Sequence, residues 1–392
     1  MDQPITGLIT ALASNPPFAF PISANFPAAA PAPVSTLGPL FSGTPSSITP
    51  LTVNHDFRNA NVQSWNLNVQ HQITKDTGIM VGYFGVKGTH LEIDRNLNQP
   101  TVPGNALTRP FKVLQGSILP LTGLGPIITQ RDSSSNSIYH ALWVTANRRF
   151  SRGLQFNASY TYSHSIDDNS RNAEAVVMQD STNVPGERGS SDFDVRHRFV
   201  ANAIYELPFK GNRLVVGWEV TSIVTTQTGN PFNVVLATAT LNGVGNTVRP
   251  NIFAPLVVTG DPAHWFDLSS AAAAFPVADN AQTGFGNLGR NAFTGPGFTD
   301  VDFAVVKNTK LIERFNLQLR VDAFDVLNHP NFAQPGPFTG FTSSSLIYVT
   351  NPASPTGPKI ISSSFGAITA TRFPTADAGS SRQLQLALKL RF

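Results

Sequence analysis

The sequence contains no cysteine among its 392 residues. Disulfide frameworks, thiolate metal sites and cysteine nucleophiles are therefore excluded. Charged residues are also scarce, because they make up 13% of the chain against roughly 25% in an ordinary soluble domain. Since hydrophobic residues account for 41%, most of the polar remainder is uncharged. This is not the composition of a helical cytosolic enzyme.

No segment predicts a membrane-spanning helix or a secretory signal. The longest span without a charged residue, from Gln3 to His55, contains ten prolines, which a spanning helix of about 18 or more residues does not tolerate. The N-terminal residues Met1, Asp2 and Gln3 lack a basic segment, so no signal peptide is expected. Either the protein stays in the cytoplasm or its true N-terminus lies upstream. The formal charge of +3 is spread along the chain, and no nucleic-acid partner is expected.

Alternation of apolar and polar residues begins at Asn61 and predicts strands with two unlike faces. Residues 1–58, rich in Pro, Ala and Ser, show no such period and are expected to form an irregular leader. Residues 59–392 are expected to form a β-sheet region. Its nine predicted strands are Trp65–Ile73, Ile79–Lys87, Tyr139–Phe150, Leu154–Tyr162, Phe199–Leu207, Leu214–Val224, Val301–Val305, Phe315–Ala323 and Leu384–Phe392.

Short turns alternate strictly with long connections between these strands. The long connections, roughly 88–138, 166–195, 229–297 and 328–381, are loaded with Gly, Pro, Asn, Ser and Asp. Such loops argue against a soluble sandwich, whereas an outer-membrane barrel has short periplasmic turns and long extracellular loops. The second faces of the strands are also too polar for the dry interior of a sandwich. The sequence therefore predicts an all-β antiparallel meander, a partial transmembrane β-barrel in the outer membrane.

Several separated motifs resemble one family in the right order. They lie at Trp65–Gln70, Tyr83–Leu91, Asn96–Pro100, Ser191–Phe199 and Phe324–Phe332, and they look like the C-terminal barrel region of Oar-like TonB-dependent outer-membrane transporters with a carboxypeptidase-regulatory-like domain. The resemblance covers about residues 55–392. It implies a many-stranded barrel around an N-terminal plug, energised by the inner-membrane TonB complex.

The sequence departs from that family pattern because it shows no plug, no TonB box and no regulatory-like domain. It is therefore expected to be the distal piece of a longer receptor, with residues 1–58 as part of an extracellular loop. Contact with the TonB complex would then depend on a missing N-terminal region. The other expected partners are outer-membrane lipid and the machinery that inserts outer-membrane barrels.

The densest charged cluster lies at the start of the fifth predicted strand. Asp192, Asp194, Arg196 and His197 could bind a ligand at the extracellular mouth. Alternatively, these charges pair among themselves or line the lumen. No loop has the calcium-binding spacing that ends in a bidentate Glu, so no metal site is predicted.

A second candidate contact at the rim is His329, which is followed by Pro330. The structural alternative is a turn that ends a strand, because proline cannot continue ladder pairing and Asn favours turns. The sequence has no metalloprotease, nucleophile-elbow or phosphate-loop motif. Neither enzymatic activity nor a cofactor is therefore predicted.

The C-terminal strand resembles the signal by which the insertion machinery recognises outer-membrane barrels. Its apolar residues share one face because the strand period is two; they are Leu384, Leu386, Leu388, Leu390 and the terminal Phe392. The alternative is an ordinary amphipathic edge strand.

Two functions remain open. The first is an outer-membrane barrel segment of a TonB-dependent transporter that takes up an unknown bulky substrate. The second is a surface-exposed structural or adhesive protein whose long loops bind glycans or cells. A soluble β enzyme is disfavoured by the polar second faces and the missing catalytic motifs.

Overall fold

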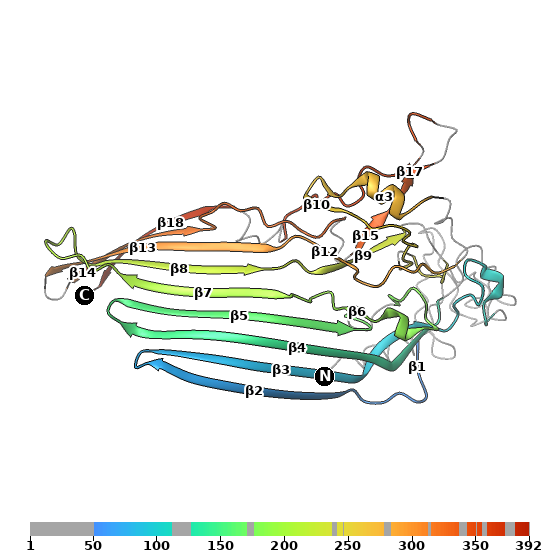
Figure 1. Cartoon of the computed structure of the whole chain (residues 1–392), viewed down its shortest axis with the longest axis horizontal. Coiled ribbons are helices and arrows are strands. Elements are labelled where there is room, and N and C mark those ends of the chain that lie inside the picture. The colour runs from blue at the N-terminus through green and yellow to red at the C-terminus, as the bar shows by residue number, and fades with distance from the viewer. Residues whose placement is uncertain are drawn as a thin grey trace, which may run out of the picture.

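The computed structural model describes residues 51–111, 127–170, 176–236, 241–245, 247–277, 284–312, 315–336, 343–349, 351–354, 359–372 and 381–391. Nine long strands form one antiparallel meander in the order β18-β14-β13-β8-β7-β5-β4-β3-β2 (Figure 1). They are β2 (Asn61–Thr74), β3 (Thr77–Asn96), β4 (Thr129–Ser151), β5 (Leu154–Asp167), β7 (His197–Glu206), β8 (Trp218–Gln227), β13 (Phe298–Ile312), β14 (Phe315–Phe324) and β18 (Gln383–Arg391). The predicted all-β meander is confirmed.

Several strands run further than the alternation predicted, and β3 and β4 gain the most residues. β3 and β4 continue to Asn96 and back to Thr129, with register shifts between Gly88 and Ile93. The alternation disappears there because the extensions lie under the long connections, and even polar residues such as Asp94 and Asp132 are buried. Two short strands join this part of the sheet: β1 (Leu51–Val53) pairs in parallel with β4, and β6 (Gly189–Ser190) pairs with β5.

One predicted strand begins later than expected. Leu214 and Val216 were placed in the strand that ends near Val224, but β8 begins only at Trp218. The preceding residue, Gly217, has a φ of 82°, in the left-handed region that favours glycine. A Cβ at this position would lie 2.3 Å from the backbone oxygen of Asn308. The chain therefore turns before β8, and Leu214 and Val216 belong to the β7–β8 turn.

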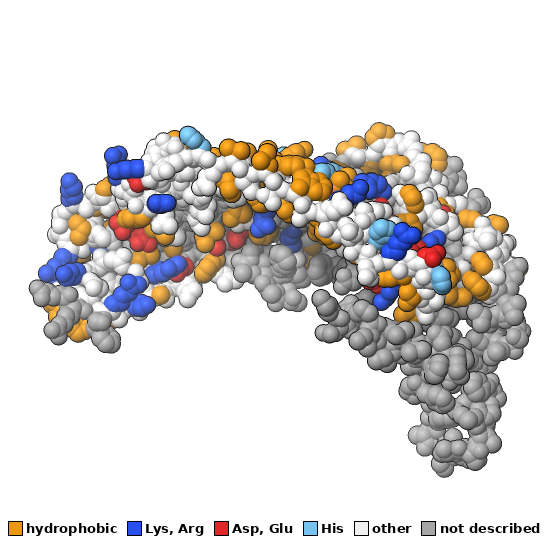
Figure 2. Space-filling view, turned by 90° about the horizontal axis from the view of Figure 1, so that it is seen from below, with side chains coloured by type: hydrophobic (Ala, Val, Ile, Leu, Met, Phe, Trp, Pro, Cys, Tyr) orange, Lys and Arg blue, Asp and Glu red, His pale blue; other side chains and the backbone are white. Residues whose placement is uncertain are grey.

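The register places apolar residues on one face and polar residues on the other. Ala146, Ala158, Ala201, Val224 and Val301 form one continuous cross-strand row. The adjacent row on the opposite face contains Asn147, Asn157 and Asn202, because neighbouring residues of a strand point to opposite sides. Seen from the β2 edge, the body is arched, and hydrophobic side chains gather along the middle of its outer side (Figure 2).

The sheet is not closed into a barrel. In the described part of the chain, β2 pairs only with β3 and β18 pairs only with β14. Leu384, Leu386 and Leu388 on β18 are about 70% exposed (70%, 75% and 69%). The four short turns and the end of β18 lie at one end of the sheet, and the long connections lie at the other (Figure 1). These ends are called the turn end and the loop end below.

The connections at the loop end have a structure that the sequence did not predict. They contain η1 (Ala106–Thr108), η2 (Val184–Glu187), β9 (Pro231–Leu236), β10 (Val258–Asp261), β11 (His264–Phe266), α3 (Leu268–Ala274), β12 (Phe293–Thr294), β15 (Ser343–Leu346), β16 (Tyr348–Val349) and β17 (Ile360–Ile361). The segments around α3 and β9 share a hydrophobic core that includes Phe232, Phe266, Phe275 and Phe365. Phe266 stacks on Phe365 with ring centroids 5.2 Å apart. We call this assembly the loop layer.

Helices are short throughout the described residues. α3 has seven residues, and none of the described helices is long and apolar enough to cross a membrane.

A new charge is expected to cost much more folding free energy on the apolar face than on the polar face. Val224 lies midway along the apolar face, so Val224→Arg is expected to cost about 2–4 kcal/mol of folding free energy in lipid, since a charge in hydrocarbon has no good partner. Asn202 lies beside this row but on the polar face, so Asn202→Arg should cost far less. Urea titration in phosphatidylcholine vesicles would measure both costs, and equal costs would contradict the expectation that the apolar face contacts lipid.

Candidate functional site

The candidate site is the rim where the loop layer meets the sheet. Asp194 lies there between β5 and β7 and is buried. Its carboxylate accepts hydrogen bonds from the backbone N–H of Ser165 at 2.7 Å and from Nδ1 of His164 at 3.0 Å, and Nε of Arg196 lies 3.2 Å away. Nη2 of Arg196 also lies 2.9 Å from Nε2 of His164. Because arginine can only donate, Nε2 of His164 accepts and Nδ1 carries the proton donated to Asp194.

Asp192 joins the rim to the β8–β13 connection. Its carboxylate accepts a hydrogen bond of 2.7 Å from the side chain of Asn291, and Nη1 of Arg290 lies 3.6 Å away. Arg290 also donates to the carboxylate and the carbonyl oxygen of Asp167 and, at 2.7 Å, to the carbonyl oxygen of Glu187. One guanidinium therefore holds together the end of β5, the β5–β7 connection and the β8–β13 connection.

Glu187 and Arg249 form the most buried ion pair of the rim. Nη1 and Nη2 of Arg249 lie 2.7 Å and 3.2 Å from the two carboxylate oxygens of Glu187, and both side chains are less than 5% exposed (3% and 4%). Nε of Arg249 donates to the carbonyl oxygen of Leu288 at 2.8 Å, and the backbone N–H of Gln179 donates to Glu187. A bidentate pair of this kind fixes orientation as well as charge.

A second group of charges lies where β3 and β4 extend beneath the loop layer. Arg131 lies between Glu92 and Asp94, with Nε 2.6 Å and 3.5 Å from their carboxylates. Burial raises the pKa of Asp94 to about 6 despite the nearby Arg131. Burial also tends to raise the pKa of Asp132. Hydrogen bonds from Arg95, Ser133 and Asn54 outweigh it and hold the pKa of that carboxyl below its ordinary value.

The structure separates the residues that the sequence placed together. Asp192, Asp194 and Arg196 belong to the rim network, where their charges pair. His197 lies on the apolar face, with Nδ1 2.8 Å from the hydroxyl of Tyr160 and its ring 5.1 Å from that of Tyr162. His329 follows β14 in an exposed turn, and its backbone N–H donates to Asp325. Of the five candidate contact residues, Asp192, Asp194 and Arg196 therefore lie in the rim network. His197 and His329 lie outside it.

Sequence reasoning missed Glu187, Arg249, Arg290 and Asn242. Their partners are distant in the chain: Arg290 lies 123 residues from Asp167, and Arg249 lies 62 residues from Glu187. Asn242 donates to the carbonyl oxygens of Met178 and Gln179 at 3.0 Å. No local spacing in the sequence could have identified them.

Aromatic residues form two bands on the apolar face. Near the loop end, the hydroxyl of Tyr83 lies 2.7 Å from Nδ1 of His140, and the ring of Trp65 covers Gly85, where a Cβ would lie 2.3 Å from it. The second band lies near the turn end and includes Tyr205. Tyr162 in the first band is eight residues from Leu154, which pairs with Tyr205. At about 3.4 Å per residue and a tilt of about 40°, the bands are about 20 Å apart, close to the apolar height of about 25 Å in outer-membrane barrels.

Only part of the candidate insertion signal lies within the residues that the structure describes. Leu384, Leu386, Leu388 and Leu390 share the exposed apolar face of β18, whereas Phe392 lies outside the described residues. The described residues also contain no cluster of three or more His, Asp or Glu side chains that could hold a metal ion.

A family profile described as an outer membrane beta barrel domain matches residues 2–385. No curated protein matches the sequence.

Solved structures of outer-membrane proteins resemble the chain, and three of them are named here. They are the outer membrane transporter YddB from Escherichia coli (9% identity, TM-score 0.42, 88% of this chain and 34% of that chain), the ferric-catecholate import receptor Fiu from E. coli K12 (10%, 0.39, 86% and 28%), and the FrpB iron transporter from Neisseria meningitidis (11%, 0.37, 88% and 33%). The chain thus spans about a third of the length of these proteins.

The buried pair of Glu187 and Arg249 should hold the loop layer in place. Glu187→Gln leaves the buried guanidinium without its counter-charge, which typically costs about 3–5 kcal/mol. We expect amides around Val248 and Leu288 to lose a corresponding amount of protection in hydrogen exchange, while the amides of β4 and β5 stay protected. Glu206→Gln, at an exposed position of β7, is the matched control. Unchanged protection in Glu187→Gln would show that the pair does not hold the layer.

Proposed function

Because the chain belongs to the outer membrane beta barrel domain family, we propose that it is part of the barrel of a TonB-dependent transporter that takes up a bulky solute. The observation that carries this proposal is the unequal chemistry of the two faces in an open, curved sheet. A polar inner face lined by residues such as Asn147, Asn157 and Asn202 suits a hydrated lumen rather than a packed core. The proposal requires no catalytic residue.

The unpaired edges support closure by strands from outside this chain. Unpaired N–H and C=O groups of β2 and β18 would be costly in hydrocarbon, where no water can satisfy them. A barrel completed by further strands removes both edges. In this proposal, contact with the TonB complex also depends on residues outside the chain.

The family resemblance of the five motifs supports TonB dependence in particular. The first two lie in β2 and β3, and Asn96–Pro100 begins at the last residue of β3. Ser191–Phe199 supplies Asp194 and Arg196 to the rim, and Phe324–Phe332 supplies the turn after β14. Three of the five motifs therefore lie at or near the loop end, where a solute from outside the cell would arrive.

The loop layer favours one alternative function. A rigid outer surface with its own hydrophobic core would also suit a protein that binds glycans or cells without transport. In both functions, the rim network holds the loops in one arrangement.

Growth and uptake distinguish the two functions. We expect a strain lacking the gene to lose growth on one medium of a set in which a ferric chelate, an oligosaccharide or a peptide is the limiting nutrient. Inactivation of TonB should cause the same loss of uptake. Loss of cell or glycan binding with uptake intact in every medium would instead support the adhesive function.

We further propose that the C-terminal strand is recognised by the outer-membrane insertion machinery. Its exposed leucines, spaced by two on one face, support this role. Deleting Phe392 from the full-length protein should lower the yield of heat-modifiable barrel in the outer membrane and leave periplasmic aggregates, because the terminal aromatic residue of the proposed signal is lost. Gln385→Ala, on the polar face of the same strand, should leave the yield unchanged. Equal yields from the deletion and the wild type would contradict the proposal.

A further inference from the structure

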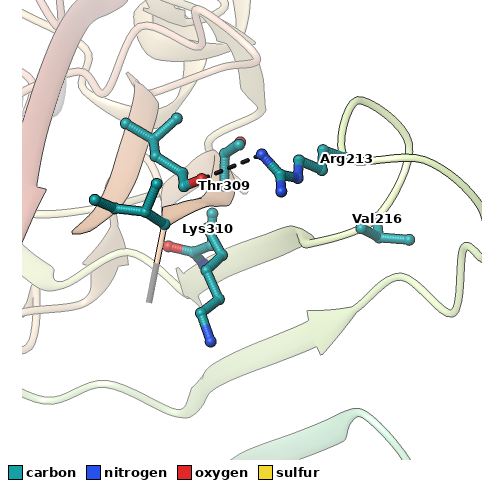
Figure 3. A pocket seen from close by; sticks show the side chains of 7 residues that line it. Arg213, Val216, Thr309 and Lys310 are labelled. Atoms are coloured by element: carbon teal, nitrogen blue, oxygen red, sulfur yellow. Dashed lines mark hydrogen bonds between the residues drawn. The ribbon is translucent and has the colours of Figure 1, made fainter. Parts of the chain in front are cut away.

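The exposed basic residues Arg213 and Lys310 at the turn end do not converge on one point. They line a cavity of about 420 Å³ between the β7–β8 turn and the end of β13. Nη1 of Arg213 donates to the carbonyl oxygen of Leu311 at 3.1 Å, whereas the Lys310 side chain points away from that guanidinium (Figure 3). The two charges therefore do not share a ligand.

A different kind of cation, Arg109, is buried at the loop end. It follows η1 in the β3–β4 connection and is 2% exposed. Its Nε and Nη1 atoms are buried and have no hydrogen-bond partner among the described residues. The buried guanidinium groups of Arg249 and Arg290, in contrast, lie against the carboxylates of Glu187 and Asp167. Within the described part of the chain, Arg109 thus has no counter-charge.

The segments that adjoin this place in the sequence cannot supply a carboxylate. Residues 112–126 follow Arg109 closely, residues 237–240 precede the turn at 241–245, and neither segment contains Asp or Glu. Burial lowers the pKa of the Arg109 guanidinium, but an arginine side chain keeps its proton. A buried charge without a partner is strongly unfavourable. An anion from outside the chain would remove this cost.

Three long connections meet at Arg109, which itself belongs to the β3–β4 connection. The β8–β13 connection approaches its guanidinium at Gly243. Asn242 joins the β5–β7 connection to this place, because its side chain donates to the carbonyl oxygen of Met178 at 3.0 Å. Asn96, the last residue of β3, donates from Nδ2 to the carbonyl oxygen of Asn242 at 3.0 Å. We call this meeting point the junction.

Gly243 leaves room beside the guanidinium. A Cβ at this position would still lie 3.4 Å from Nη2 of Arg109 and 3.5 Å from Nδ2 of Asn96, so both nitrogens border the same open space. An amide nitrogen has two N–H groups, and Asn96 uses one of them for the carbonyl oxygen of Asn242. Arg109 and Asn96 can therefore donate to one oxyanion at the junction.

We propose that the junction binds a carboxylate group of a ligand that arrives from outside the cell. Arg109 donates to the two carboxylate oxygens along one edge of its planar guanidinium, and Asn96 donates to one of them. A single unmatched positive charge favours a monoanionic carboxylate over a dianionic phosphate. The inference goes beyond transport, since an acidic glycan bound without uptake would meet the same groups.

Hydrogen exchange of the full-length protein in detergent micelles tests the proposal. Sodium acetate is the probe, acetamide is its uncharged counterpart, and sodium chloride keeps the ionic strength constant. The backbone amides of Ile128 and Val244 are the reporters, because they donate to the side chains of Asn96 and Asn242. At ten times the half-saturating acetate concentration, we expect them to exchange about tenfold more slowly. Acetamide should have no effect, and the amides of β5 should not respond.

Variants of Arg109 assign the response to its guanidinium. Arg109→Met, which keeps the aliphatic stem, should abolish the response to acetate. Arg109→Lys should keep a weaker response, because it retains the charge without the planar fork. Arg188→Met removes an exposed arginine of the β5–β7 connection and should respond like the wild type. Heat modifiability confirms that each variant is folded.

Three results would overturn the proposal. An equal response to acetate and acetamide, or an equal response of the wild type and Arg109→Met, would show that the guanidinium binds no carboxylate. A response to inorganic phosphate without one to acetate would assign the junction to a different anion. Faster exchange of Ile128 and Val244 in Arg109→Met without acetate would show that a carboxylate of the chain already pairs with Arg109, because the substitution would leave that carboxylate unpaired.

Discussion

Backbone hydrogen bonding between neighbouring strands is the interaction on which the rest of this structure depends. The strands pair in long antiparallel registers, such as the thirteen residue pairs that join β4 to β5. Because the side-chain period is two, a slip of one residue would move every apolar side chain to the polar face. The register thus aligns one apolar row with the next across nine strands, and it places the aromatic residues in two bands at matching heights.

The loop end depends on a different interaction, the pairing of buried charges. Arg249 with Glu187 and Arg290 with Asp167 are taken out of water, and burial of each charge is unfavourable unless its partner is in place. Each pair joins connections that are far apart in sequence, so the loops can adopt only arrangements in which every pair forms. The Phe-rich core of the loop layer adds non-directional stability, whereas the ion pairs determine how the layer sits on the sheet.

The two ends of the sheet therefore have unlike electrostatics. At the loop end, the ion pairs of Arg249 with Glu187 and of Arg290 with Asp167 are buried. At the turn end, basic side chains outnumber acidic ones among the described residues, and Lys307 of β13 donates to two backbone carbonyl oxygens of the β7–β8 turn.

The sequence by itself determined the nine long strands, their faces and their order. Strand alternation is a local property, and short turns such as the one between Ser151 and Leu154 leave antiparallel pairing as the only arrangement. The late start of β8 was missed because the close approach of Gly217 to Asn308 is a contact between distant segments. For the same reason, the sequence identified Asp194 and Arg196 as a charged cluster but not their partner His164. Only the tertiary structure decided that Glu187, Arg249 and Arg290 hold the loop layer, because the energy of a buried charge depends on which side chain the fold brings within about 3 Å of it.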